Sequence, residues 1–143
     1  MKIKDPWIAK EKFKFLSKPL SQLDYYKWTE FIDKNNDYFT WIEDTEDGKK
    51  TLASIDKVPE SFREGVLKGH NKRKAYAEFN GTKGYHEIVI QFNEELNVIG
   101  TTFMKKITKE HIKRLLKLAN HMEALLLNNG TTIIDDNYLK TLE

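Results

Sequence analysis

Hydrophobic and polar residues alternate over two neighbouring stretches in the middle of the chain, residues 73–79 and 85–92. This period of two is typical of half-buried β-strands, and in the second stretch it places His86, Ile88, Ile90 and Phe92 on one face. The segment 80–84 between them, Asn-Gly-Thr-Lys-Gly, has the composition of a hairpin turn. A third apolar stretch follows at 96–104, so the pattern predicts an antiparallel meander.

A period of three to four residues predicts two helices. The first covers about 21–35, where Ser21 and Asp24 resemble a capping box, and the second covers about 108–128, with Thr108 as N-cap. The second helix is expected to face the sheet with an apolar stripe, formed by Ile112, Leu115, Leu116, Ala119, Met122 and Leu126.

The remaining segments have weaker patterns. Residues 38–42 have strand composition, the acidic segment 43–48 is interpreted as a turn, and residues 49–55 as a weaker returning strand. A short helix is expected at 60–67, an edge strand at 132–134, and a polar tail at 136–143. Residues 1–20 are interpreted as an arm or an edge strand, with strand-like alternation at 12–16.

These elements predict an α+β fold in which an antiparallel sheet of about four to five strands packs against an N-terminal and a long C-terminal helix. The chain has 143 residues and no internal repeat or linker composition, so we expect one domain over 1–143. Hydrophobic residues make up 39% of the chain and charged residues 32%, with abundant aromatic residues, which predicts a folded protein.

Cysteine is absent, and no apolar stretch approaches the ~20 residues that span a bilayer. We therefore expect a cytoplasmic protein without a membrane partner. The formal net charge is only +2, which implies no general attraction to nucleic acid or anionic lipid. The charges are unevenly distributed, because residues 30–60 are rich in acidic groups and both flanks are rich in lysine.

The sequence contains no Gly-x-Ser-x-Gly motif, phosphate-binding loop or dinucleotide fingerprint. Its four histidines, His70, His86, His111 and His121, are not grouped at metal-ligand spacing. We therefore expect no catalytic residue, no bound metal and no cofactor, which predicts a protein that is not an enzyme.

The leading hypothesis is a protein-interaction module that binds a basic protein partner through its acidic segment. Tyr26 and Phe39 lie off the expected core faces, so they are candidate exposed anchors beside that segment. Size and character are similar to those of bacterial immunity or antitoxin-type proteins, which cover a partner with a charged surface. The predicted partner-binding residues are Glu43, Asp44, Glu46, Asp47, Tyr26 and Phe39.

Two alternatives stay open. A basic loop and a lysine stripe at helical spacing favour a nucleic-acid-associated protein, with Lys72, Arg73, Lys74, Lys109, Lys113 and Lys117 as the binding residues. The other alternative is a small-ligand binder or enzyme with a pocket between sheet and helices that holds His86 or Tyr85.

Overall fold

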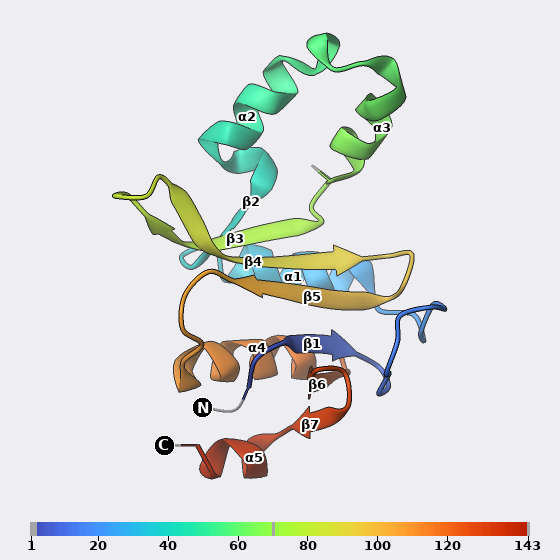
Figure 1. Ribbon diagram of the computed structural model, residues 1–143, viewed down its shortest axis with the longest axis vertical. Coiled ribbons are helices and arrows are strands. Elements are labelled where there is room, and N and C mark those ends of the chain that lie inside the picture. The colour runs from blue at the N-terminus through green and yellow to red at the C-terminus, as the bar shows by residue number, and fades with distance from the viewer. Residues whose placement is uncertain (1–2, 70, 143) are drawn as a thin grey trace.

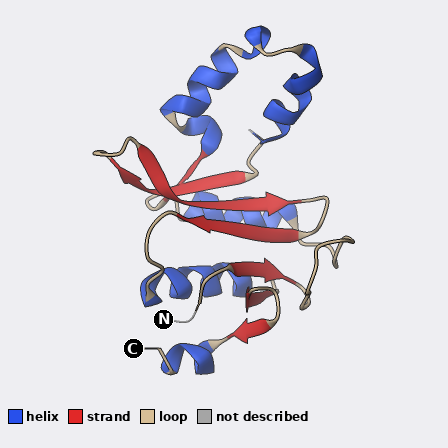
Figure 2. Cartoon of the chain, in the orientation of Figure 1, coloured by secondary structure: helices blue, strands red, loops and turns tan. Residues whose placement is uncertain are grey.

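An antiparallel seven-stranded sheet organises the chain in the computed structural model, which describes residues 3–69 and 71–142 (Figures 1 and 2). The fold is α+β, as the sequence predicts, but the sheet is larger than the expected meander. Its order is β2-β3-β4-β5-β1-β6-β7. The strands are β1 (Pro6–Ala9), β2 (Phe39–Trp41), β3 (Lys74–Asn80), β4 (Tyr85–Asn93), β5 (Val98–Phe103), β6 (Leu125–Asn128) and β7 (Thr132–Ile134).

Two helices cover one face of this sheet and enclose the main core (Figure 1). They are α1 (Tyr25–Lys34) and α4 (Lys109–His121), and the alternation of β4 directs Ile88, Ile90 and Phe92 toward them. The stripe of α4 is buried from Ile112 to Ala119, as its spacing predicts. The other helices are α2 (Glu46–Ala53), α3 (Glu60–Gly69) and α5 (Asp136–Lys140), with single 3-10 turns η1 (Ile42–Asp44) and η2 (Ile55–Lys57).

The first twenty residues differ from the expected arm or edge strand. β1 lies inside the sheet, paired with both β5 and β6. The segment after it crosses the sheet face opposite α4, where Phe13 and Leu16 pack against a small cluster around Val98 and Leu127. The backbone N–H of Phe13 donates to the carbonyl of Gly130 at 2.8 Å, so residues 12–16 are held to the sheet without forming a strand.

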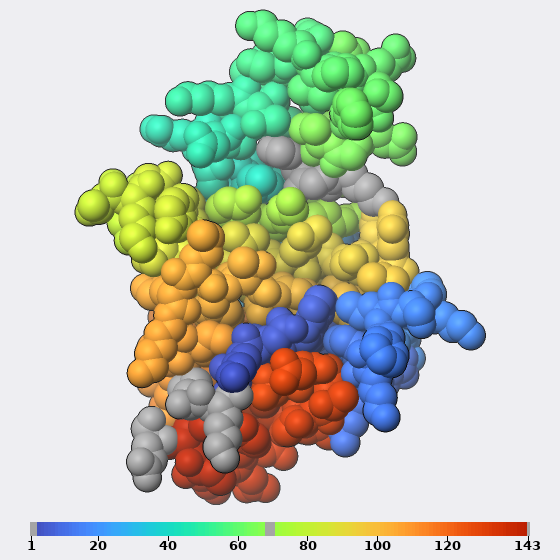
Figure 3. Space-filling view, viewed as in Figure 1, coloured from blue at the N-terminus to red at the C-terminus, as the bar shows by residue number. Residues whose placement is uncertain are grey.

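The segment between β2 and β3 is helical and stands away from the sheet. We call it the α2–α3 arm (residues 46–69), and Figure 3 shows it projecting beyond the edge at which β2 lies. The returning strand expected at 49–55 is wrong, because Thr45 caps a helix there. Within 49–67 no residue is buried, so the arm contributes little to the core.

The ends of the two main helices also differ from the prediction. The first begins at Tyr25 with Asp24 as N-cap, while Ser21 donates its hydroxyl to Glu11. The last ends at His121, because Glu123 takes a left-handed conformation with φ of 53°. Residues 125–128, expected to continue that helix, form β6 instead.

The C-terminal segment is partly as expected. The edge strand predicted at 132–134 is confirmed as β7, whereas the expected polar tail contains α5 with a buried Leu139. Among the described helices, none has the length and apolar character needed to cross a membrane.

Candidate functional site

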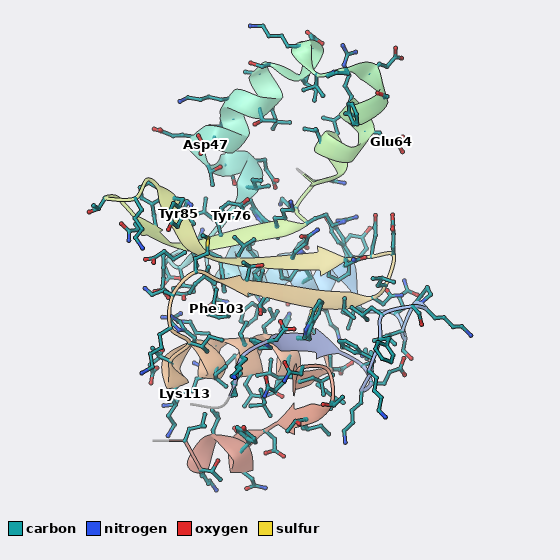
Figure 4. The ribbon with its side chains drawn as sticks, viewed as in Figure 1. Asp47, Glu64, Tyr76, Tyr85, Phe103 and Lys113 are labelled. Atoms are coloured by element: carbon teal, nitrogen blue, oxygen red, sulfur yellow. The ribbon has the colours of Figure 1, made fainter. Side chains whose placement is uncertain are left out.

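A pocket of about 600 Å³ lies between the start of α2 and the β3–β4 hairpin. We call it the acidic–aromatic pocket, because its lining includes two carboxylates, three aromatic rings and an imidazole: Glu46, Asp47, Tyr76, Phe79, Tyr85 and His86. Figure 4 shows Asp47 on α2 above Tyr76 and Tyr85 on the hairpin. Tyr76 lies between Ala75 and Ala77, which are buried in the α1–α4 core, so the pocket opens on the opposite face of the sheet.

The acidic wall is the first turn of α2. The hydroxyl of Thr45 accepts a hydrogen bond from the N–H of Gly48 at 3.0 Å, which fixes the start of the helix. Gly48 packs so closely on η1 that a Cβ would lie 1.7 Å from the carbonyl oxygen of Ile42. This contact holds Glu46 and Asp47 exposed at the rim, where the positive end of the helix dipole stabilises their charges.

The aromatic wall comes from β3 and β4. The ring of His86 lies 5.4 Å from that of Tyr76 and 5.0 Å from that of Phe79, measured between centroids. Phe79 is 61% exposed and Tyr85 is 37% exposed, so two large rings face solvent beside the pocket. Aromatic side chains exposed at the edge of a pocket offer apolar area to a binding partner.

The electrostatics of the pocket favour cations. Burial lowers the pKa of His86, which therefore stays uncharged near neutral pH. Burial, and then the nearby charge of Asp47, raises the pKa of Tyr76. The described residues that line the pocket include no lysine or arginine. Among the ion pairs of the described residues, none involves Glu46 or Asp47. Carboxylates beside aromatic faces attract ammonium and guanidinium groups.

A polar network lies on the other side of the hairpin, centred on Glu78. Its carboxylate accepts hydrogen bonds from Lys105 Nζ at 2.7 Å, from His111 Nε2 at 2.7 Å, and from the hydroxyl of Tyr38. The backbone N–H of Thr108 donates to His111 Nδ1 at 3.0 Å, so the ring proton of a neutral His111 lies on Nε2 and points to Glu78. The network thus ties β3 to the start of α4.

These contacts shift the pKa of Glu78. Burial alone would raise the pKa, but the hydrogen bonds from Lys105, Tyr38 and His111 outweigh it and lower the pKa from 4.5 to about 2. The same network, after burial, raises the pKa of Tyr38. Glu78 is therefore a charged acceptor at neutral pH.

Acid unfolding should report this shift. A carboxyl whose pKa is lowered on folding contributes stability that is present above pH 4.5 and is lost as the pH falls toward 2. We expect the wild type to be more stable than Glu78→Gln near neutral pH, with the difference shrinking across this window. Urea unfolding between pH 2 and 7 measures it, with Glu64→Gln on exposed α3 as the control. A wild-type advantage that does not change with pH would contradict the proposed role of the charge.

The predicted acidic set is only partly brought together. Glu46 and Asp47 line the pocket, but Glu43 is half-buried and accepts the backbone N–H of Lys72 at 3.2 Å, and Asp44 lines a separate cavity.

The two proposed anchors do not flank the pocket. Phe39, expected to be exposed, is 5% exposed because β2 directs it into the core. Tyr26 is 79% exposed, but it belongs to α1, which covers the other face of the sheet.

The predicted basic set is divided between residues 72–74, at and just before the start of β3, and α4, and some of its members form ion pairs with acidic residues. Lys72 pairs with Asp33 at 3.5 Å and Arg73 pairs with Glu94 at 2.7 Å. Lys74 begins β3, at the opposite end of the strand from Glu78 and the start of α4.

On α4, the lysine stripe does not form one surface with the basic loop. Lys113 pairs with Glu110 at 3.3 Å, and Lys109 donates to the carbonyl of Leu142 at 3.4 Å. Lys113 and Lys117 line a cavity of about 170 Å³ with Arg114, and Figure 4 shows Lys113 well below the acidic–aromatic pocket.

Sequence reasoning missed Tyr76 and Phe79 as pocket residues, whereas Tyr85 and His86 were named for a ligand pocket. The alternation of β4 also predicts His86 on the core face with Ile88, but its ring contacts lie with Tyr76 and Phe79. The sequence offers one signal, since three aromatic residues and a histidine flank a single hairpin turn.

The described residues contain no group of three or more histidine, aspartate or glutamate side chains placed to hold a metal ion. The site is therefore defined by its pocket, its carboxylates and its aromatic rings. Comparisons with protein-family models, with curated proteins and with solved structures found no match to this chain.

Proposed function

We propose that this protein is a non-catalytic interaction module that binds a basic protein partner through the acidic–aromatic pocket. The supporting observation is the combination, in one cavity of about 600 Å³, of two exposed carboxylates with several aromatic rings. An arginine or lysine side chain of a partner matches this chemistry. Covering a partner in this way is how immunity or antitoxin-type proteins act, and it requires no catalytic group.

The energies favour several weak contacts acting together. A cation over an aromatic ring contributes about 0.5–2 kcal/mol, and an exposed ion pair about 0.2–1 kcal/mol. One basic side chain in the pocket would therefore bind weakly, and a protein partner would add area around it. The exposed ring of Phe79 at the rim supplies such area, because aromatic side chains are enriched at interface centres.

Removing the two rim charges should weaken binding of a basic probe. The probe is an acetylated and amidated Gly-Arg-Gly peptide, with the citrulline peptide as its neutral isostere. We expect millimolar binding of the arginine peptide, seen as NMR shifts of Tyr76, Phe79 and His86, and roughly tenfold weaker binding by the Glu46→Gln/Asp47→Asn variant. Raising the salt concentration should shrink the difference between the two proteins.

The matched control is Glu60→Gln/Glu64→Gln, which removes two exposed carboxylates from α3 outside the pocket. Equal affinities for the arginine and citrulline peptides, or equal losses in both variants, would contradict the proposal. Submicromolar binding of single-stranded DNA that is lost on replacing Lys113 and Lys117 would instead support the nucleic-acid alternative.

A second candidate, the binding of a small cationic ligand, is favoured by the presence of Tyr85 and His86 in the same pocket. Free arginine amide separates the two candidates. A small-ligand site should bind arginine amide as tightly as any longer peptide, whereas a protein-binding surface should gain affinity as residues are added around the arginine.

A further inference from the structure

β3 changes faces at Glu78, the residue between Ala77 and Phe79. Ala77 is buried in the α1–α4 core and pairs with Ile88, so regular alternation would also direct Phe79 into that core and Glu78 toward the pocket. The structure has the reverse arrangement. Phe79 contacts His86 and lines the pocket, while the carboxylate of Glu78 reaches His111 on α4.

The backbone of Glu78 explains this reversal. Its φ is 55°, in the left-handed region that a residue with a side chain enters only at a cost in free energy. A left-handed residue inside a strand breaks the alternation, so the residues that follow turn to the opposite face. His86 pairs with Phe79 across the hairpin and turns with it, which brings its ring beside Tyr76.

The side-chain network of Glu78 offsets that cost. Its three hydrogen bonds come from Tyr38 before β2, from Lys105 after β5, and from His111 on α4. Hydrogen bonds to a charged carboxylate are among the stronger ones in proteins. The guanidinium of Arg114 lies 3.8 Å from the centroid of the Tyr38 ring, which further fixes this donor.

We propose that Glu78 is a positioning residue for the acidic–aromatic pocket, because its anchored left-handed conformation places Phe79 and His86 beside Tyr76. Glu78 itself is not among the residues that line the pocket. The effect of Glu78 on binding rests on the proposed function, but the effect on ring placement does not.

Two substitutions separate the backbone from the side chain. Glu78→Val removes the network and strongly disfavours the left-handed conformation, whereas Glu78→Gly removes the network but adopts that conformation freely. Contacts between Phe79, His86 and Tyr76 are measured as nuclear Overhauser effects and as ring-current shifts of the His86 protons. We expect Glu78→Val to lose these contacts and Glu78→Gly to retain them.

Glu123→Val is the matched control, because Glu123 is also a left-handed glutamate, with φ of 53°, but lies after α4 and outside the pocket. It should leave the ring contacts unchanged. If Glu78→Val does not fold, Glu78→Ala replaces it, since alanine also lacks the network and disfavours positive φ. Wild-type ring contacts in Glu78→Val or Glu78→Ala, or their complete loss in Glu78→Gly, would overturn the proposal.

The arginine peptide provides the second readout. Glu78→Val should bind it about two- to fivefold more weakly than Glu78→Gly, the range expected for losing one cation–π contact. A wild-type protein that does not bind the peptide contradicts the proposed function and leaves the ring-contact result intact. Lost ring contacts in Glu78→Val with unchanged peptide affinity would show that the rings are not part of the binding site.

Discussion

Replacing Trp28 by alanine is expected to lower the free energy of unfolding by about 3–5 kcal/mol. Trp28 is fully buried on α1, and its indole N–H donates to the carbonyl of Lys72 at 2.8 Å. Its ring lies 5.7 Å from that of Trp41 and 5.9 Å from that of Phe92, so one side chain joins α1 to both β2 and β4. Alanine would leave a large cavity and remove the hydrogen bond to the carbonyl of Lys72.

Urea unfolding at neutral pH measures this loss. Tyr26→Ala is the control, because Tyr26 lies on the same helix but is exposed, and its replacement should change the stability by no more than about 0.5 kcal/mol. Similar losses for both substitutions would contradict the packing of α1 on the sheet.

Replacing Gly48 by alanine is expected to detach the start of α2 from η1. The new methyl group would lie 1.7 Å from the carbonyl oxygen of Ile42, which is backbone and has little room to move. We expect a destabilisation of about 1–3 kcal/mol, typical of overpacking, and a loss of peptide binding comparable to that of Glu46→Gln/Asp47→Asn. The binding loss follows because both carboxylates belong to the displaced turn.

Gly65→Ala is the matched control on α3, where no atom lies within 4 Å of the added methyl group. The same substitution should there stabilise the protein by about 0.5–1 kcal/mol, because alanine favours helix. Unfolding curves and the NMR shifts of residues 45–48 measure both variants. Equal effects at the two glycines would show that the close approach of α2 to η1 does not restrain the arm.

The hairpin and the packed face of α4 were predictable because local and tertiary signals agree there. Asn80 and Gly81 begin a turn between two alternating stretches, and the stripe from Ile112 to Ala119 keeps helical spacing. The end of α4 was not predictable for two reasons. The apolar residues of 125–127 continue the helical spacing of the stripe, and the left-handed position that ends the helix is occupied by Glu123 rather than by a glycine. Tertiary pairing with β1 decides that these residues form a strand.

The site was only partly predictable. Thr45 followed by Glu46 and Asp47 is a helix-start signal, but the acidic composition together with Gly48 led to its interpretation as a turn. The aromatic wall depends on the left-handed conformation of Glu78. Glutamate is not a residue type that favours this conformation, so the sequence does not indicate it. That conformation depends on partners more than twenty residues distant, so alternation alone places Phe79 and His86 on the wrong face.

β1 joins two parts of the sheet, because Ile8 pairs with Ile99 of β5 on one side and with Leu126 of β6 on the other. These contacts link residues separated by on the order of a hundred positions, and closing such a long loop slows folding. During synthesis β1 is made long before either partner strand. Until β1 docks, β5 and β6 each expose an edge that is open to pairing with other chains, so we expect aggregation to be favoured in the interval before docking.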